Sequence, residues 1–223
     1  MSLRIAIQMD PLSTVNIDAD TTFALAEVAQ ARGHKLWIYE PRHLSFDTGR
    51  VTARARPVTF QRIADQPGIT GEETLLDLAD DIDVVLMRQD PPFDMAYITA
   101  THLLEMVHPA TLVVNDPAHV RNAPEKIFVF RFPDLMPPTL ITAEPARIDA
   151  FRAEHGDIIV KPLYGNGGAG VFHIRPEDDN LNALTEMFFA ASREPLMVQA
   201  YIDAVRSGDK RIVLIDGIAV GAI

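Results

Sequence analysis

The strongest local signal in the sequence is Asp157-Ile-Ile-Val-Lys-Pro-Leu-Tyr-Gly-Asn-Gly-Gly-Ala-Gly-Val-Phe-His-Ile174. An apolar run that ends at Lys161 leads into a glycine-rich loop, and an alternating run from Val171 to Ile174 follows the loop. This order predicts a β-hairpin whose tip presents backbone N–H groups without side chains in the way. A tip of this kind folds over a triphosphate in protein kinases, and Lys161 would neutralise phosphate charge. The alternative is a plain glycine-rich turn with an exposed lysine.

The same loop also has the spacing of a dinucleotide-binding fingerprint, at Gly165, Gly167 and Gly170. That fingerprint needs a helix directly after the glycines, because the N-terminus of the helix holds the pyrophosphate. Here a strand-like run follows and Pro176 ends it, so we reject a dinucleotide site. We also reject a phosphate-binding P-loop, because no Lys-Ser or Lys-Thr follows Gly170.

Composition limits the kinds of partner that this protein can have. The chain has 223 residues, 48% of them apolar, which is enough for one large domain or two small ones. Its formal charge of −11 argues against nonspecific binding to nucleic acid or to anionic membranes, so local Lys and Arg must hold any anionic ligand. The absence of cysteine excludes disulfides, thiolate zinc sites and cysteine nucleophiles, and it suits a cytoplasmic protein. The N-terminal apolar run is too short for a signal peptide, and no segment has the length of a membrane span.

The first half of the chain reads as α/β. Residues 4–9 predict a buried strand, Asp20 is a candidate N-cap, and Gly33 is placed to end a helix, after which residues 35–39 predict a second strand. This is a βαβ unit with parallel strands. We expect one apolar face on the helix, made of Phe23, Ala24, Val28 and Ala29.

The rest of the first half contains a segment without a predicted fold, followed by two predicted strands and a predicted helix. Residues 41–73 have mixed signals, and we assign no fold to them. Residues 83–87 predict a strand, 95–107 a helix and 111–114 a strand.

The pattern changes from about Pro124, and we place a domain boundary there, near a proline-rich linker at residues 132–138. Strands at 139–142, 157–161, 171–174 and 195–201, with helices at 145–156 and 181–191, predict an antiparallel sheet with helices on one face. Residues 211–223 read as a hairpin around Asp216-Gly217. Because the chain ends inside an apolar strand, we expect a fragment or a truncated gene product.

Three further segments accompany the glycine loop, and each has an ordinary structural alternative. Lys126 would be a solvated helix residue if it stood alone. Residues 195–202 form an apolar strand that offers a wall and backbone hydrogen bonds to a purine, or that is simply a core strand. Ser207-Gly-Asp-Lys-Arg211 returns two cations and a carboxylate after that strand, and the alternative is a surface turn.

Taken together and in this order, these segments resemble the nucleotide site of ATP-grasp ligases. The first half narrows the resemblance to the bacterial glutathione synthetase family, and the most specific motif is Met87-Arg-Gln-Asp-Pro-Pro-Phe-Asp94. The resemblance covers essentially the whole chain. The other matching stretches are Gln8-Met-Asp-Pro11, Asn16-Ile17, Val114-Asn-Asp-Pro117, Arg121-Asn-Ala-Pro-Glu-Lys126 and Gly208-Asp-Lys-Arg211.

The resemblance implies an α/β fold in three parts. These are a parallel-sheet pre-ATP-grasp domain that binds substrate (1–123), an α+β ATP-grasp small lobe with the glycine-rich loop (124–203) and the start of the C-terminal lobe (204–223), whose remainder is missing. It also implies catalytic roles for Lys161 and Arg211, and substrate binding by Asn16, Arg88 and Asp90. The strand before Tyr201 has Ala200 where a relative has Asn, which changes little because backbone groups recognise the purine. The nucleotide-binding positions implied are Lys126, Lys161, Gly165, Asn166, Gly167, Gly168, Ala169, Gly170, Gln199, Tyr201, Ile202 and Asp209.

The implied reaction joins γ-glutamylcysteine to glycine through an acyl phosphate and yields glutathione, ADP and phosphate. ATP and Mg²⁺ are the implied cofactors, with the metal ligands expected beyond residue 223, so we expect this chain alone to be inactive as a ligase. The full-length protein is expected to be a cytoplasmic homo-oligomer. We read His43, His102, His155 and His173 as ordinary histidines rather than metal ligands, because they lack ligand spacing.

Three other functions remain open. The first is a noncatalytic nucleotide- or peptide-binding module, and the second is another ATP-grasp peptide ligase, which should lack the motif at 87–94. A dinucleotide oxidoreductase comes third, and it would need a helix after Gly170.

Overall fold

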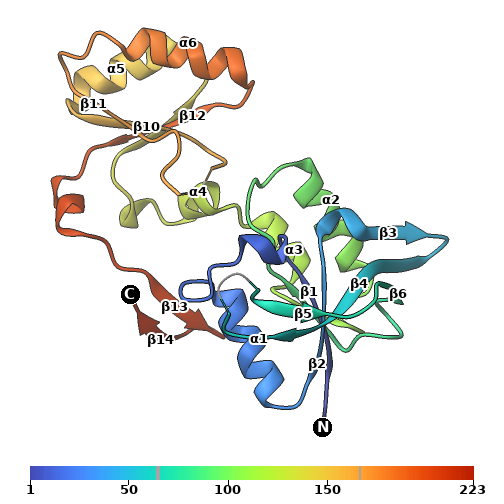
Figure 1. Ribbon diagram of the computed structural model, residues 1–223. Coiled ribbons are helices and arrows are strands. Elements are labelled where there is room, and N and C mark those ends of the chain that lie inside the picture. The colour runs from blue at the N-terminus through green and yellow to red at the C-terminus, as the bar shows by residue number, and fades with distance from the viewer. Residues whose placement is uncertain (64–65, 166) are drawn as a thin grey trace. The chain divides into compact units, whose positions relative to one another are not determined.

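A computed structural model describes residues 1–63, 66–165 and 167–223, and the chain divides into two compact units (Figure 1). Unit 1 comprises Met1–Phe128 with the short segment Tyr164–Asn166, and unit 2 comprises Val129–Leu163 and Gly167–Ile223. Asn166, a predicted nucleotide-binding residue, lies outside the described residues.

Unit 1 is built on a sheet whose central strands are parallel. β1 (Arg4–Gln8) pairs with β2 (Lys35–Tyr39) on one side and with β7 (Val84–Met87) on the other, and β7 pairs with β8 (Leu112–Val114). Helix α1 (Thr21–Ala31) connects β1 to β2. The predicted parallel βαβ unit is confirmed.

The ends of α1 follow the predicted chemistry, but its apolar face does not. The Asp20 carboxylate accepts hydrogen bonds from the backbone N–H groups of Thr22 and Phe23, and Gly33 adopts a φ of 80° just after the helix. Ala24 and Val28 are exposed, so the predicted face is half wrong. Val28 is five positions after Phe23 and so lies about 140° around the helix from it. The buried stripe is Thr22, Phe23, Ala26 and Ala29.

The segment without an assigned fold extends the sheet with antiparallel strands. A 3₁₀ turn (η2, Pro41–His43) leads into β3 (Leu44–Asp47) and the long strand β4 (Arg50–Phe60). β4 pairs with β2, β3, β5 (Gly68–Thr70) and β6 (Thr74–Asp77). The resulting order is β3-β4-β2-β1-β7-β8, with β5 and β6 attached to β4.

Both faces of the parallel strands are covered. Phe23 and Ala26 of α1 share a core cluster with Ile5 and Ile7 of β1. Ala6 of β1 belongs to the other cluster, which includes buried residues of α2 (Met95–Glu105). Because neighbours in a strand point to opposite faces, the two helices cover opposite faces of the sheet. The short helices α3 (Pro117–Asn122) and α4 (Glu125–Phe128) follow β8.

Unit 2 contains the predicted antiparallel sheet, in the order β11-β10-β12-β9. Its strands are β9 (Thr139–Thr142), β10 (Ile158–Pro162), β11 (Phe172–Ile174) and β12 (Leu196–Ala200). Helices α5 (Pro145–His155) and α6 (Leu181–Ala191) lie together on one face (Figure 1). The predicted α+β arrangement is confirmed.

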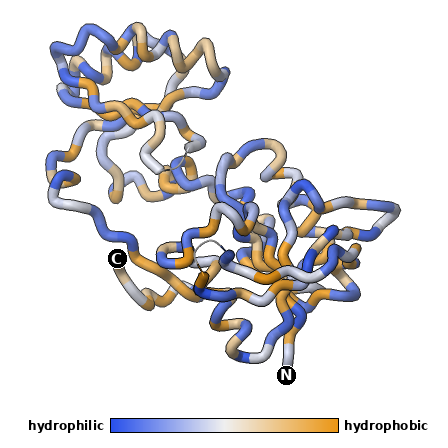
Figure 2. Tube along the Cα trace, in the orientation of Figure 1, coloured by the Kyte–Doolittle hydropathy of each residue, from blue (hydrophilic) through white to orange (hydrophobic). Residues whose placement is uncertain are grey.

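The C-terminal segment forms the predicted hairpin of β13 (Ile212–Ile215) and β14 (Ile218–Ala222). Asp216 and Gly217 have φ values of 50° and 77°, as the Asp-Gly pair predicts. Figure 2 shows how apolar this hairpin is. Four 3₁₀ turns complete the chain, namely η1 (Leu12–Thr14), η3 (Val129–Arg131), η4 (Pro133–Leu135) and η5 (Asp203–Ser207). Among the described residues, no helix is long and apolar enough to cross a membrane.

Candidate functional site

The glycine-rich loop connects two antiparallel strands of unit 2, and its residue Gly165 belongs to unit 1. Ile158 pairs with Ile174 and Val160 with Phe172, so a strand and not a helix follows the loop. This confirms the rejection of a dinucleotide site. Gly167, Gly168 and Gly170 adopt φ values of 61°, 77° and 72°, a region that residues with a Cβ atom rarely occupy.

Two of the predicted nucleotide-binding residues, Lys161 and Gln199, lie on the face of the sheet that the helices leave open. Ile158 and Val160 of β10 are buried in the core cluster that α5 and α6 share. Alternation along the strand therefore turns Ile159 and Lys161 to the opposite face. Val198 of β12 is buried in the same cluster, so its neighbour Gln199 joins them on the open face.

A cavity of about 570 Å³ lies on this open face. Five of the predicted residues line it together: Lys161, Gln199, Tyr201, Ile202 and Asp209. Ala200 and Gly208 lie in the predicted purine strand and the predicted turn, but sequence reasoning gave no role to the remaining lining residues, because small and apolar side chains carry no signal of binding by themselves. These remaining residues are Pro137, Ile159, Val171, Ala204 and Val205.

The lining suits a ligand that is mostly apolar and carries charge at one end. Its volume lies within the range of about 300–1,000 Å³ that is usual for small-molecule sites. Aliphatic side chains give a wall for a planar ring, Asp209 offers an acceptor for sugar hydroxyls, and Lys161 offers a cation for phosphate. A purine nucleotide combines these features in one molecule.

Tyr201 is held in this cavity by residues that the sequence did not single out. The ring of His173 stacks on the ring of Tyr201 with centroids 4.0 Å apart, and His173 Nε2 lies 2.8 Å from a carboxylate oxygen of Asp157. Arg206 Nε donates a hydrogen bond of 2.9 Å to the Tyr201 hydroxyl, which raises the pKa of Arg206. His173, which we predicted not to be a metal ligand, stacks on Tyr201 and supports the cavity wall.

Two predicted cations lie outside this cavity lining. Lys126 belongs to α4 of unit 1, and its Nζ donates a hydrogen bond of 2.8 Å to the carbonyl oxygen of Gly165 in the glycine-rich loop. Arg211 starts the C-terminal hairpin, where its backbone N–H bonds to the carbonyl oxygen of Ile223 and its side chain is exposed. Because Lys126 and Lys161 belong to different units, their convergence on one triphosphate stays a prediction.

Unit 1 brings Arg88 and Asp90 together at the carboxyl ends of β1 and β7. Arg88 Nε donates to the hydroxyl of Thr22 and Nη2 to that of Thr21, at 3.1 and 2.8 Å, and the Asp90 backbone N–H donates to Asp10 Oδ2 at 2.7 Å. All five residues line a polar cavity of about 230 Å³. Ligands of open α/β sheets bind at this edge of the strands.

Asn16, the third predicted substrate residue, shapes the loop beside this cavity. Its side-chain oxygen accepts from the Asp18 backbone N–H at 3.1 Å, and its backbone carbonyl accepts from Ala19 and Asp20. Asn16 therefore leads into the N-cap of α1, and it does not appear among the described residues that line the cavity.

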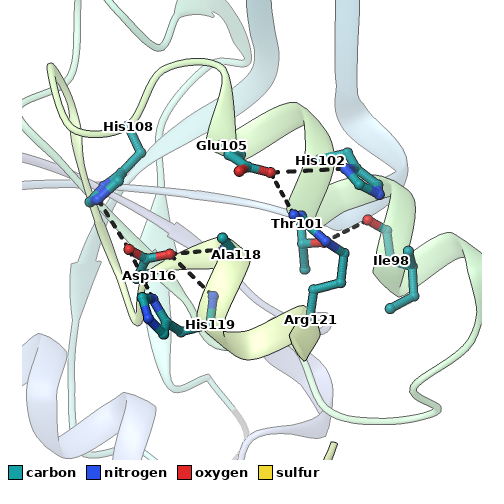
Figure 3. Close-up of polar contacts among 9 residues, drawn as sticks. All are labelled: Ile98, Thr101, His102, Glu105, His108, Asp116, Ala118, His119 and Arg121. Carbon is teal, nitrogen blue, oxygen red and sulfur yellow. Dashed lines mark hydrogen bonds and ion pairs between the residues drawn. The ribbon is translucent and has the colours of Figure 1, made fainter. Parts of the chain in front are cut away.

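A separate polar cluster fixes the loop between α2 and α3 (Figure 3). The Asp116 carboxylate caps α3 by accepting from the backbone N–H groups of Ala118 and His119, and these bonds with the nearby His119 side chain lower the pKa of Asp116. Arg121 bonds to Glu105 of α2 at 2.8 Å. These contacts join the two helices.

No group of three or more His, Cys, Asp or Glu residues that could hold a metal ion occurs in the described part of the chain. The described residues therefore do not provide the metal site that the resemblance implies.

Two family models match this chain in succession. One is described as "Prokaryotic glutathione synthetase, N-terminal domain" and matches residues 3–121, and the other as "Prokaryotic glutathione synthetase, ATP-grasp domain" and matches residues 125–223. The glutathione synthetases of Brucella melitensis and Mesorhizobium japonicum are 58% and 59% identical to it, over 100% of this chain and 71% of each relative. That of Salmonella typhimurium is 40% identical over 96% of this chain and 68% of the relative.

Solved structures agree on the fold. The D-cycloserine synthetase DcsG superposes with a TM-score of 0.66 at 16% identity, over 98% of this chain and 66% of that one. An ATP-grasp RimK domain protein from Sphaerobacter thermophilus gives a TM-score of 0.63 at 19% identity, over 95% and 68%. At these identities the likeness supports the ATP-grasp fold alone.

Proposed function

Since this chain belongs to the prokaryotic glutathione synthetase family, we propose that it acts in the ATP-dependent ligation of γ-glutamylcysteine to glycine. The family match supports an ATP-dependent carboxylate–amine ligase. The observation that carries the nucleotide site is that Lys161, Gln199, Tyr201, Ile202 and Asp209 line one cavity.

The nucleotide is proposed to bind on the open face of the unit 2 sheet. Its purine lies against the wall of Ile202 and Tyr201, Asp209 accepts from the ribose hydroxyls, and Lys161 neutralises the phosphates. The glycine-rich loop supplies backbone N–H donors, since Gly167 and Gly168 leave open space where side chains would stand.

Lys126 and Arg211 are proposed to complete the positive charge around the phosphates. The bond from Lys126 to Gly165 supports a role beside the glycine-rich loop. Arg211 follows the cavity residue Asp209 by two positions and is exposed, so it is free of the apolar core.

The peptide substrate is proposed to bind in unit 1. Arg88 is fixed by two threonine hydroxyls at the mouth of a polar cavity, which supports a role in holding a carboxylate. Asp90 and Asn16 would position the same substrate from the two loops at this edge of the sheet.

The chemistry then needs two displacements. A carboxylate oxygen of γ-glutamylcysteine attacks the γ-phosphorus of ATP, and the bond to ADP breaks, which gives an acyl phosphate. The amine of glycine attacks the acyl carbon and forms the C–N bond of a tetrahedral intermediate. The nitrogen loses a proton to solvent, and the intermediate collapses to the amide as the C–O bond breaks and phosphate leaves. Lys161 and Arg211 stabilise the negative charge that gathers on the transferred phosphoryl group.

Mg²⁺ would share this charge in the proposed enzyme. Because the described residues hold no cluster of metal ligands, no step above is assigned to the ion. Homo-oligomer formation and a cytoplasmic location remain predictions. The absence of nucleic acid and membrane partners, which the net charge of −11 favours, is also a prediction. The division of the chain into domains at residues 123 and 203 is another.

Isothermal titration with ATP and with γ-glutamylcysteine tests the proposal. We expect the chain to bind both, and Lys161→Met to weaken ATP binding about tenfold or more through the loss of a charge-assisted contact. Lys35→Met is the matched control, because Lys35 is an exposed lysine of β2 in unit 1. A chain that binds neither ligand, or equal losses in the two variants, would overturn the proposal.

A further inference from the structure

A second cavity in unit 1 lies beside the one that contains Arg88. It measures about 230 Å³, and it is lined by residues at the ends of β1 and β2 and by residues of β4. Its charged lining residues are Arg54 and Arg56, together with Asp10, Glu40 and Glu73. Neither the family resemblance nor the proposed function above gives it a role.

Arg54 and Arg56 supply two cations to the lining of this cavity. Arg54 and Arg56 alternate along β4 with the buried Ala53 and Ala55, so both guanidinium groups lie on the same face of the strand. Both form ion pairs with Glu73, at N–O distances of 3.9 and 3.7 Å. Both distances are longer than a hydrogen bond. The N–H groups that face Glu73 can therefore donate hydrogen bonds to a ligand.

Two carboxylates besides Glu73 line the same cavity. Asp10 follows β1, where its Oδ2 accepts from the backbone N–H of Asp90. Glu40 follows β2, and its Oε1 accepts from Arg42 at 3.0 Å. Each carboxylate has a second oxygen besides the one in these bonds.

A small ligand with both charges fits this lining. A head group that carries a carboxylate and an ammonium ion on adjacent atoms, as an α-amino acid does, would meet the arginines with one group and the acids with the other. The cavity volume is below the range for drug-sized ligands, so it suits a head group and not a whole nucleotide. Met9 and Ile38 give the cavity an apolar part for the carbon chain.

The two unit 1 cavities share Met9 and Asp10 in their linings, so they are neighbours. We propose that the Arg54–Arg56 cavity receives the γ-glutamyl head of γ-glutamylcysteine. Its α-carboxylate lies between Arg54 and Arg56, its α-ammonium faces Asp10 and Glu40, and the cysteinyl end extends toward Arg88. This inference rests on the proposed function, and it gives the substrate a direction within unit 1.

The test measures binding of three dipeptides to the 223-residue chain by isothermal titration. They are γ-glutamylcysteine, γ-aminobutyryl-cysteine, which lacks the α-carboxylate, and glutaryl-cysteine, which lacks the α-ammonium. The variants are Arg54→Met/Arg56→Met and the control Arg32→Met, which removes an exposed cation just after α1, outside the cavity lining. Thermal unfolding and ADP binding show whether each variant is folded.

We expect the double variant to bind γ-glutamylcysteine about tenfold to a hundredfold more weakly than the unchanged chain does. Binding of γ-aminobutyryl-cysteine should not change, because that ligand has no α-carboxylate to lose, and Arg32→Met should affect neither ligand. Glutaryl-cysteine should keep its sensitivity to the arginines and bind more weakly overall. If the double variant unfolds, Arg54→Lys/Arg56→Lys takes its place, because it keeps both charges but removes the planar guanidinium donors. It should also bind γ-glutamylcysteine more weakly than the unchanged chain, by a smaller factor, with no change for γ-aminobutyryl-cysteine.

Equal losses for γ-glutamylcysteine and γ-aminobutyryl-cysteine, or no loss for either, would overturn the assignment of the cavity while the proposed function stands. A chain that binds ADP but fails to bind γ-glutamylcysteine would overturn the proposed peptide substrate, and this inference with it.

Discussion

The side-chain amides of Gln8 and Gln89 bond to each other in the interior of unit 1, where the two residues are 0% and 8% exposed. The Arg88 backbone N–H also donates to the carbonyl oxygen of Gln8 at 2.8 Å, so this segment continues the pairing of β1 with β7. Because neighbouring residues in extended chain face opposite sides, the inward Gln89 turns Arg88 and Asp90 toward the polar cavity. The buried pair thus sets the direction of both predicted substrate residues.

Replacing Gln89→Leu should therefore lower stability and weaken peptide binding together. The change strands the Gln8 amide in the core, which costs about 1–3 kcal/mol of unfolding free energy. Urea unfolding and titration with γ-glutamylcysteine measure the two effects. Gln8→Leu/Gln89→Leu is the comparison, since it removes both polar groups and should recover part of the stability without recovering binding. Equal stability of the single and double variants would contradict this account.

His173→Ala should weaken nucleotide binding by removing the ring that stacks on Tyr201. The loss of about 0.5–1.5 kcal/mol for a stacked pair corresponds to roughly a two- to tenfold rise in the Kd for ADP. His173→Phe keeps the stacking and should bind ADP nearly as well as the unchanged chain. His102→Ala, at an exposed histidine of α2, is the control, and an equal effect there would exclude a specific role for His173.

Two glycines of the loop should differ in their tolerance of alanine. Gly170 has a φ of 72°, and a Cβ there would lie 3.1 Å from Pro162 Cδ, whereas a Cβ at Gly167 would have nothing within 4 Å. Both changes carry the strain of the left-handed region, about 1–2 kcal/mol, and Gly170→Ala adds a tight contact with the Pro162 ring. Thermal unfolding should therefore show a larger drop for Gly170→Ala, and a larger drop for Gly167→Ala would contradict the loop geometry.

The Arg50–Asp77 pair should make stability depend on pH in the acid range. Arg50 Nε donates to the Asp77 carboxylate at 2.6 Å, and this bond, with the backbone N–H of Ala79, lowers the pKa of Asp77 from its ordinary value of 3.8. A carboxyl whose pKa is lowered by folding stabilises the protein above the unfolded value, and that contribution is lost as the pH falls through the folded value. The midpoint temperature of thermal unfolding should decrease as the pH is lowered below about 4. This decrease should be smaller in Arg50→Met than in the control Arg32→Met.

The 223-residue chain alone should form no detectable glutathione from ATP, γ-glutamylcysteine and glycine. The described residues hold no cluster of metal ligands to share the phosphate charge. A coupled assay for ADP release with chromatographic detection of glutathione checks this. Glutathione above the level of a Lys161→Met control would contradict it.

Sequence reasoning predicted the elements that have strong local signals. Asp20 and Gly33 mark the ends of α1 by their capping chemistry, and Asp216-Gly217 marks the C-terminal turn by its backbone preference. The long strand β4 was missed because its middle consists of the small buried residues Ala53 and Ala55, which alternate with arginines. Because alanine is only weakly apolar, its alternation with charged residues gives little of the hydrophobic contrast by which a strand is recognised in a sequence.

The candidate site was predicted where residues close in sequence line the same cavity, as Gln199 and Tyr201 do. Contacts between distant segments were not predicted. The stacking of His173 on Tyr201 and the pairing of Gln8 with Gln89 depend on strand order and register, which a single sequence does not specify.

The C-terminal hairpin has a practical consequence for handling the protein. Every residue of β13 and β14 is exposed, and the two strands pair only with each other among the described segments. Their outer edges therefore present unpaired backbone groups flanked by isoleucine, leucine and valine, the pattern on which aggregation by strand addition begins. Concentrated solutions of this chain will self-associate through that end unless another surface covers it.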